Sequence, residues 1–165
     1  MEKGLILAKR AFQKGLDEMR FVTEYDYGFC VSRFHDAAEF LLYAIARKEN
    51  ANLRHEFMEM YDEIKNKSGI EPDGKEDMRR LNDLKNAFKH RVILIMPADA
   101  EEQRLRTEGF LRNNMRKFLA SILICSAWPT LFRIRKRRND SKKPNPSLRL
   151  GSTWRWSQPR RRRSF

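Results

Sequence analysis

The chain is 165 residues long, which is the size of one domain and is enough to bury a core without disulfide bonds or a structural metal. Its formal net charge of +13 is uneven, because residues 131–165 hold 13 of the 35 Lys and Arg residues but one of the 22 Asp and Glu residues. The first 130 residues are therefore almost neutral, so the net charge does not by itself indicate a nucleic-acid-binding domain.

The first half of the chain shows two helical patterns. Apolar residues recur at steps of three and four from Leu5 to Met19, which predicts a first amphipathic helix. Residues 25–28 are predicted to be a break. A second helix is predicted over residues 31–48, and its broad apolar face indicates that it lies centrally; this face consists of Phe34, Ala37, Ala38, Leu41, Leu42 and Ile45.

Three further helices are predicted from the spacing of apolar residues and from end signals. The third carries the apolar residues of 53–64 and ends at Gly69, a typical C-terminal glycine. The fourth begins near Lys75 and the fifth at Pro97, the latter continuing to about Phe118. No strand-like alternation competes with these patterns. The predicted fold class is all-α, an antiparallel bundle of four to five helices over residues 1–120.

Residues 121–165 are predicted to be a disordered basic tail, because they show no helical or strand periodicity. Two explanations stay open. The tail is a nucleic-acid-binding arm, or it is the product of a frameshift near codon 118. In the first case two basic clusters would bind phosphates, with Trp154 and Trp156 stacking on bases; the clusters are Arg135, Lys136, Arg137, Arg138, Arg160, Arg161, Arg162 and Arg163.

The cysteines and the apolar runs argue against secretion and against a membrane. Cys30 and Cys125 are too far apart in the sequence to form a metal-binding motif, and we expect both to be reduced thiols. The apolar run at residues 119–128 is about half as long as a membrane span. We therefore predict a cytoplasmic protein with no membrane segment, metal or cofactor.

The candidate site lies at the end of the fourth helix, in residues 85–90. RNA is cleaved without metal when its 2′-hydroxyl attacks the adjacent phosphate. His90 is suited to move a proton near neutral pH, and Lys85 or Lys89 to stabilise charge on the phosphate. Asn86 would orient His90 or the phosphate. The alternative is a solvated helix end, where the same cations stabilise the helix dipole.

Helix geometry places a condition on this site. At about 100 degrees per residue, Lys85 and His90 lie about 140 degrees apart on a straight helix. They meet through long side-chain reach, through distortion of the helix, or through a second subunit. His35 is expected to pack near the start of a helix, outside the site.

Two segments resemble the HEPN superfamily: RFHDAAEFLLYA at residues 33–44 and LNDLKNAFKH at residues 81–90. Members are small helical bundles of prokaryotic defence, toxin–antitoxin and nucleotidyltransferase-associated systems. Their common motif is an arginine followed by a histidine after four to six residues, frequently with an asparagine directly after the arginine. The resemblance covers roughly residues 3–118.

The resemblance implies a homodimer whose motif helices face each other and form a composite, metal-independent endoribonuclease site. It implies RNA as the substrate, with an antitoxin or a nucleotidyltransferase as a further partner. Carried onto this chain, His90 is the catalytic histidine and Asn86 the polar residue of the motif. Lys85 stands at the arginine position. Glu39 would be a supporting acid, or alternatively an exposed helix carboxylate.

Two alternatives to the enzyme follow. Lysine keeps the charge of arginine but lacks the planar fork that binds phosphate in a bidentate manner. The chain is therefore also consistent with an inactive member of the fold that serves as a dimerisation or RNA/nucleotide-binding module. A third interpretation is a helical interaction protein whose arginine-rich tail binds nucleic acid electrostatically.

Overall fold

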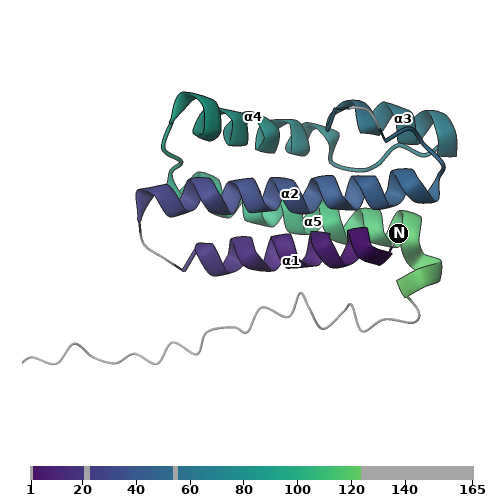
Figure 1. Ribbon diagram of the computed structural model, residues 1–165, viewed down its shortest axis with the longest axis horizontal. Helices are drawn as coiled ribbons and strands as arrows, with labels where there is room; N and C mark the ends of the chain where they lie inside the picture. The colour runs from purple at the N-terminus through teal and green to yellow at the C-terminus, as the bar shows by residue number, and fades with distance from the viewer. Residues whose placement is uncertain (1, 21–22, 54–55, 124–165) are drawn as a thin grey trace, which may run out of the picture. The chain divides into compact units, whose positions relative to one another are not determined.

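The fold is all-α, as predicted, and no strand occurs in the described residues (Figure 1). The computed structural model describes residues 2–20, 23–53 and 56–123. Within these ranges lie five packed helices: α1 (Glu2–Glu18), α2 (Glu24–Lys48), α3 (Glu59–Ser68), α4 (Lys75–Arg91) and α5 (Pro97–Leu123).

Helix α2 lies in the middle of the bundle, which confirms the position predicted for it. Figure 1 shows α2 between α1 on one side and α3 and α4 on the other, with α5 behind. Helix α2 packs against each of the other four helices. Its fully buried side chains cover more than one face and form the largest part of the core; they include Val31, Phe34, Ala37, Ala38, Leu41, Leu42 and Ile45.

The start of α2 differs from the prediction, since residues 25–28 are helical and not a break. The carboxylate of Asp26 accepts hydrogen bonds from the backbone N–H of Thr23, at 3.2 Å, and from the Thr23 hydroxyl. These bonds satisfy donors at the N-terminus and allow the helix to begin at Glu24. Local composition alone suggested a turn here.

The third helix is shorter than predicted at its start and ends where predicted. Helix α3 begins at Glu59, so Leu53 and Phe57 precede it. Its end is set by Gly69, which has a φ of 73° and donates its N–H to the carbonyl of Lys65 at 2.8 Å. A left-handed conformation of this kind favours glycine, which is why the sequence signal was reliable.

The start of α4 is held in place by Asn114 of α5, which is fully buried. The Asn114 side chain accepts a hydrogen bond from the N–H of Asp73 at 2.8 Å and donates to the Asp73 carbonyl at 3.2 Å. Lys117 adds a salt bridge to Asp73 of 2.6 Å. The loop before α4 is thus tied to α5, and this fixes where α4 begins.

The end of α4 packs on the start of α2 through two aromatic rings. Phe29 and Phe88 meet edge to face, with ring centroids 5.4 Å apart. The ring of Phe88 lies directly over Gly28, where no side chain fills the space. Helix α4 is therefore anchored at both ends, which positions the polar face between them.

The last helix continues to Leu123, beyond the boundary predicted at residue 120. The rest of the predicted tail lies outside the described residues, including both basic clusters and the two tryptophans. No described helix combines the length and the apolar character that crossing a membrane requires.

The close approach at Gly28 gives a first prediction. In Gly28→Ala the added methyl group overlaps the Phe88 ring, so we expect a loss of about 1–3 kcal/mol of unfolding free energy. The control is Gly109→Ala, since nothing lies within 4 Å of a methyl group there; alanine should stabilise α5 by up to about 1 kcal/mol. Urea denaturation measures both, and equal effects would contradict the packing described.

The anchor at Asn114 gives a second prediction. Asn114→Ala removes the acceptor of the part-buried Asp73 N–H and the donor to the Asp73 carbonyl, so it should cost about 1–3 kcal/mol. The neighbouring Asn113 is exposed, so Asn113→Ala should change stability by less than about 0.5 kcal/mol. Thermal unfolding of the two variants checks the difference, and a neutral Asn114→Ala would show that the loop is held by other groups.

Candidate functional site

An open pocket of about 440 Å³ lies between α2 and α4, a volume typical of ligand-binding sites. The segment before α3 closes one side of it. The lining residues come from these three parts of the chain: His35, Asp36 and Glu39 from α2, Asn82, Lys85, Asn86 and Lys89 from α4, and Glu56, Phe57 and Met58 from the segment before α3.

The α4 side of the pocket is a stripe of hydrogen-bond donors. Asn82, Lys85, Asn86 and Lys89 follow one another at steps of three and four, which places them on one face of the helix. Two ammonium groups and two carboxamides therefore face the same space. Three of these residues were predicted as site residues, and the pocket brings them together.

The α2 side is dominated by His35, which is 3% exposed. Its Nε2 lies 3.5 Å from Nζ of Lys85, and its ring packs on Phe57 with centroids 4.4 Å apart. Burial, and then the charge of Lys85, lower the pKa of His35 to about 3, so the imidazole is neutral. An ammonium group only donates, so we assign Nε2 as the acceptor and the ring proton to Nδ1.

Glu39 and Lys85 form the charged part of the site. Burial raises the pKa of Glu39, and the charge of Lys85 opposes this rise. Burial and the charge of Lys89 lower the pKa of Lys85, and Glu39 acts in the opposite direction. Glu39 is half-buried, so it is not the exposed carboxylate of the alternative interpretation. Mutually perturbed groups in a pocket are typical of functional sites.

His90 lies outside this pocket, as its position on the helix suggested. It is exposed in the last turn of α4 and does not line the pocket with Lys85 and Asn86. A single chain thus supplies the cations and the amide of the predicted site in one place and the histidine in another. The two-subunit site implied by the HEPN resemblance would therefore require His90 of a second chain to reach Lys85 and Asn86 of the first.

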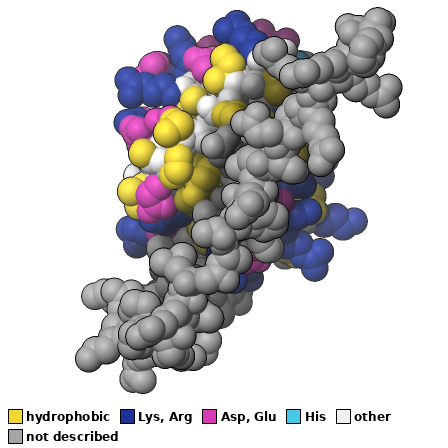
Figure 2. Space-filling model, turned by 90° about the vertical axis from the view of Figure 1, so that its left-hand side faces the viewer, with side chains coloured by type: hydrophobic (Ala, Val, Ile, Leu, Met, Phe, Trp, Pro, Cys, Tyr) yellow, Lys and Arg dark blue, Asp and Glu magenta, His cyan; other side chains and the backbone are white. Residues whose placement is uncertain are grey.

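The segment after His90 is strained and apolar. Val92 has a φ of 54°, which is unfavourable for a β-branched residue, and its N–H donates to the carbonyl of Ala87. Val92 is 75% exposed and Met96 63% exposed, with Ile93 and Leu94 exposed between them. Figure 2 faces this end of the bundle and shows hydrophobic side chains gathered on its surface.

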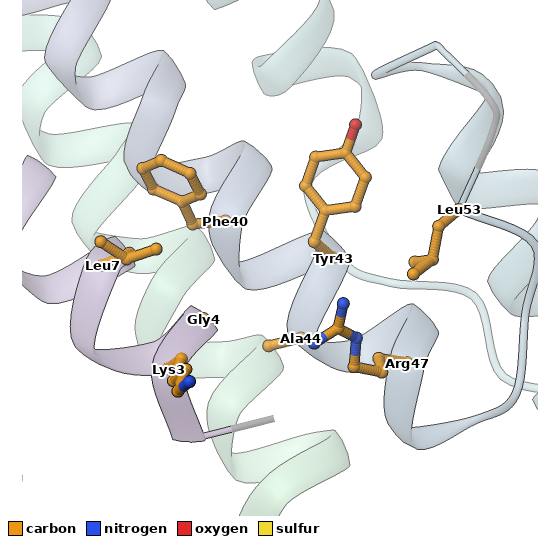
Figure 3. Close-up of a pocket in the computed structure, with 8 residues that line it drawn as sticks. All are labelled: Lys3, Gly4, Leu7, Phe40, Tyr43, Ala44, Arg47 and Leu53. Carbon is orange, nitrogen blue, oxygen red and sulfur yellow. The ribbon is translucent and has the colours of Figure 1, made fainter.

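A second pocket, of about 280 Å³, lies between α1 and α2 (Figure 3). Leu7, Phe40 and Tyr43 give it apolar walls, and Lys3 and Arg47 also line it. Gly4 lets the two helices approach closely there, since a methyl group on it would lie 3.1 Å from Cβ of Ala44. None of the predicted site residues lines this pocket.

Cys30 is not a candidate nucleophile, although its thiol is free. Its side chain is buried, and burial raises its pKa to about 12, so the reactive thiolate does not form near neutral pH. Cys125 lies outside the described residues.

Sequence reasoning missed the role of His35, which it placed outside the site. A signal was present in the chain: Glu39 follows His35 by four residues and Asp36 by three, the two spacings that bring side chains together on a helix surface. The contact with Lys85, 50 residues further along, is not visible in any local pattern.

No known family model, curated protein or solved structure matches this chain. The HEPN resemblance thus rests on the residues of the two quoted segments alone.

Proposed function

We propose that the chain is a HEPN-like protein that binds RNA in the α2–α4 pocket and cleaves it as a metal-independent endoribonuclease, acting as a homodimer in the cytoplasm. The observation that carries the proposal is the donor stripe of α4. Lys85 and Lys89 offer positive charge to a phosphodiester in this pocket. The carboxamides of Asn82 and Asn86, on the same face of α4, offer it hydrogen bonds.

The opposite wall favours RNA over DNA. Glu39 is an acceptor for a hydroxyl proton, and a ribose 2′-hydroxyl both donates and accepts hydrogen bonds. A nucleotide whose phosphate binds Lys85 and Lys89 therefore finds acceptors for its sugar on α2. A deoxyribose leaves these acceptors without a partner.

The reaction needs no group beyond the protein and the RNA. The 2′-oxygen attacks the adjacent phosphorus, so the phosphorus–O2′ bond forms and the phosphorus–O5′ bond breaks. His90 takes the proton of the 2′-hydroxyl or gives one to the leaving 5′-oxygen, and Lys85 stabilises the charge on the phosphate. The products are a 2′,3′-cyclic phosphate and a 5′-hydroxyl.

A second copy of the chain would supply His90 to this pocket. The strained, exposed segment 92–96 directly follows His90, and Tyr25 and Phe29 add exposed aromatic surface near the same end of the bundle. Exposed apolar surface of this kind is typical of protein interfaces. The antitoxin or nucleotidyltransferase partner implied by the resemblance remains a prediction.

The second candidate is a non-catalytic RNA- or nucleotide-binding module of the same fold. It is favoured by the contact between Lys85 and the buried His35, which engages Lys85 away from His90. The lysine at position 85 also favours a binding module, because it lacks the planar guanidinium with which arginine binds phosphate in a bidentate manner. Binding without cleavage would result.

The test is cleavage of a labelled single-stranded RNA in EDTA. We expect the wild-type chain to cleave and His90→Ala to lose about 10²–10⁴-fold in rate, because the proton transfer is lost. Lys85→Arg should retain or raise activity, whereas Lys85→Met should abolish it. The control is Lys67→Ala, an exposed cation of α3 that does not line the pocket, and this variant should cleave normally.

Mixing inactive variants tests the composite site directly. Lys85→Met and His90→Ala chains, refolded together, form a dimer with one intact site, so activity should return. If the wild type and Lys85→Arg both fail to cleave, the enzyme proposal is wrong. RNA binding that needs Lys85 and Lys89 then supports the binding module, whereas binding lost on deletion of residues 131–165 supports the tail.

A further inference from the structure

Three groups that commonly ligate metals lie together on α2. His35, Asp36 and Glu39 each offer one ligand atom, and these atoms all lie within 4.8 Å of one another. His35 and Glu39 are four residues apart, the spacing at which two ligands on one helix face bind the same ion.

We propose that His35, Asp36 and Glu39 bind a divalent transition-metal ion of the zinc type, and that this ion takes the place of the Lys85 ammonium. An imidazole nitrogen with two carboxylates suits zinc and its neighbours, whereas magnesium and calcium prefer oxygen ligands alone. This site goes beyond the proposed function, which assigns no metal.

The surroundings match an open metal site. The imidazole of His35 is buried, and its ring is held against Phe57. The three ligands face a pocket of about 440 Å³. Three protein ligands leave the fourth coordination position open to water or to an oxygen of a bound molecule. Structural zinc sites differ, because four protein ligands fill them.

Lys85 already acts as the cation of this cluster. Its Nζ lies 3.5 Å from the Nε2 atom that would ligate the metal, and its charge also acts on Glu39. A divalent ion on Nε2 of His35 would repel the Lys85 ammonium at this distance, and this repulsion favours displacement of Lys85. The four-carbon stem of lysine allows Lys85 to swing into the open pocket when the ion arrives.

The other charges near the cluster do not prevent binding. Arg33 bonds to Asp36 at 3.4 Å, a long contact that one carboxylate oxygen can keep while the other ligates. Lys89 adds repulsion from α4, while Glu56 adds a carboxylate to the lining. Metal and lysine therefore compete for two carboxylates and one imidazole.

The test is calorimetric titration of the full chain with zinc chloride, in a Cys125→Ser background so that the second thiol does not compete. We expect one saturable site, which His35→Ala abolishes and Glu39→Gln weakens at least about tenfold. Lys85→Met should tighten binding about tenfold, because it removes the competing cation. A misfolded variant would lose zinc affinity, so a gain in affinity in Lys85→Met is not an effect of misfolding.

The matched control is His90→Ala, which removes an exposed histidine outside the cluster and should leave zinc affinity unchanged. Binding that survives His35→Ala, or that is lost in His90→Ala, would overturn the proposal, as would unchanged affinity in Lys85→Met. The zinc titration contains no RNA, so its result is independent of the ribonuclease proposal. That proposal is tested separately by RNA cleavage in EDTA.

Discussion

The burial of α2 is the constraint on which the rest of the structure depends. Its apolar residues cover more than one face, and every other helix packs against it. Burying one such large side chain contributes about 1.5–3 kcal/mol, so the many apolar residues of α2 strongly favour its central position. Three polar residues of α2, His35, Asp36 and Glu39, line the pocket between α2 and α4. His35 and Glu39 are therefore held opposite Lys85 by the packing of their apolar neighbours.

The sequence allowed the bundle to be predicted wherever local signals were strong. Helical periodicity, Gly69 and Pro97 located the helices and several of their ends, because each signal acts within a few residues. The start of α2 was predicted wrongly, because the Asp26 cap and the packing of Phe88 over Gly28 outweigh a turn-like composition. The second of these is a long-range contact that no window of sequence contains.

Part of the candidate site could also be predicted, because some of its residues are close together in the sequence. Lys85, Asn86 and Lys89 are neighbours in sequence, so a motif finds them, and helix geometry alone indicated that His90 points elsewhere. The pocket wall on α2 required the fold. Glu39 was found through a resemblance, while His35 was missed, because its partner lies on another helix.

Lys85 links the two proposals made for this pocket. Its ammonium is half-buried between a neutral imidazole, a carboxylate and a second lysine. Such a position is a poor choice for stability alone, since a buried charge needs compensation. It is a suitable choice for a cation that moves between protein and ligand. RNA would draw Lys85 toward its phosphate, and a metal ion would displace it.

The contact between α2 and α4 across the pocket is tested most directly by a double-mutant cycle on His35 and Lys85. Unfolding free energies of the wild type, His35→Leu, Lys85→Met and the double variant would be measured by urea denaturation in EDTA. The account predicts a favourable coupling of about 1 kcal/mol, the size of a typical hydrogen bond, since the contact is long at 3.5 Å. Effects that add to within about 0.4 kcal/mol would contradict it, because the two side chains would then not interact.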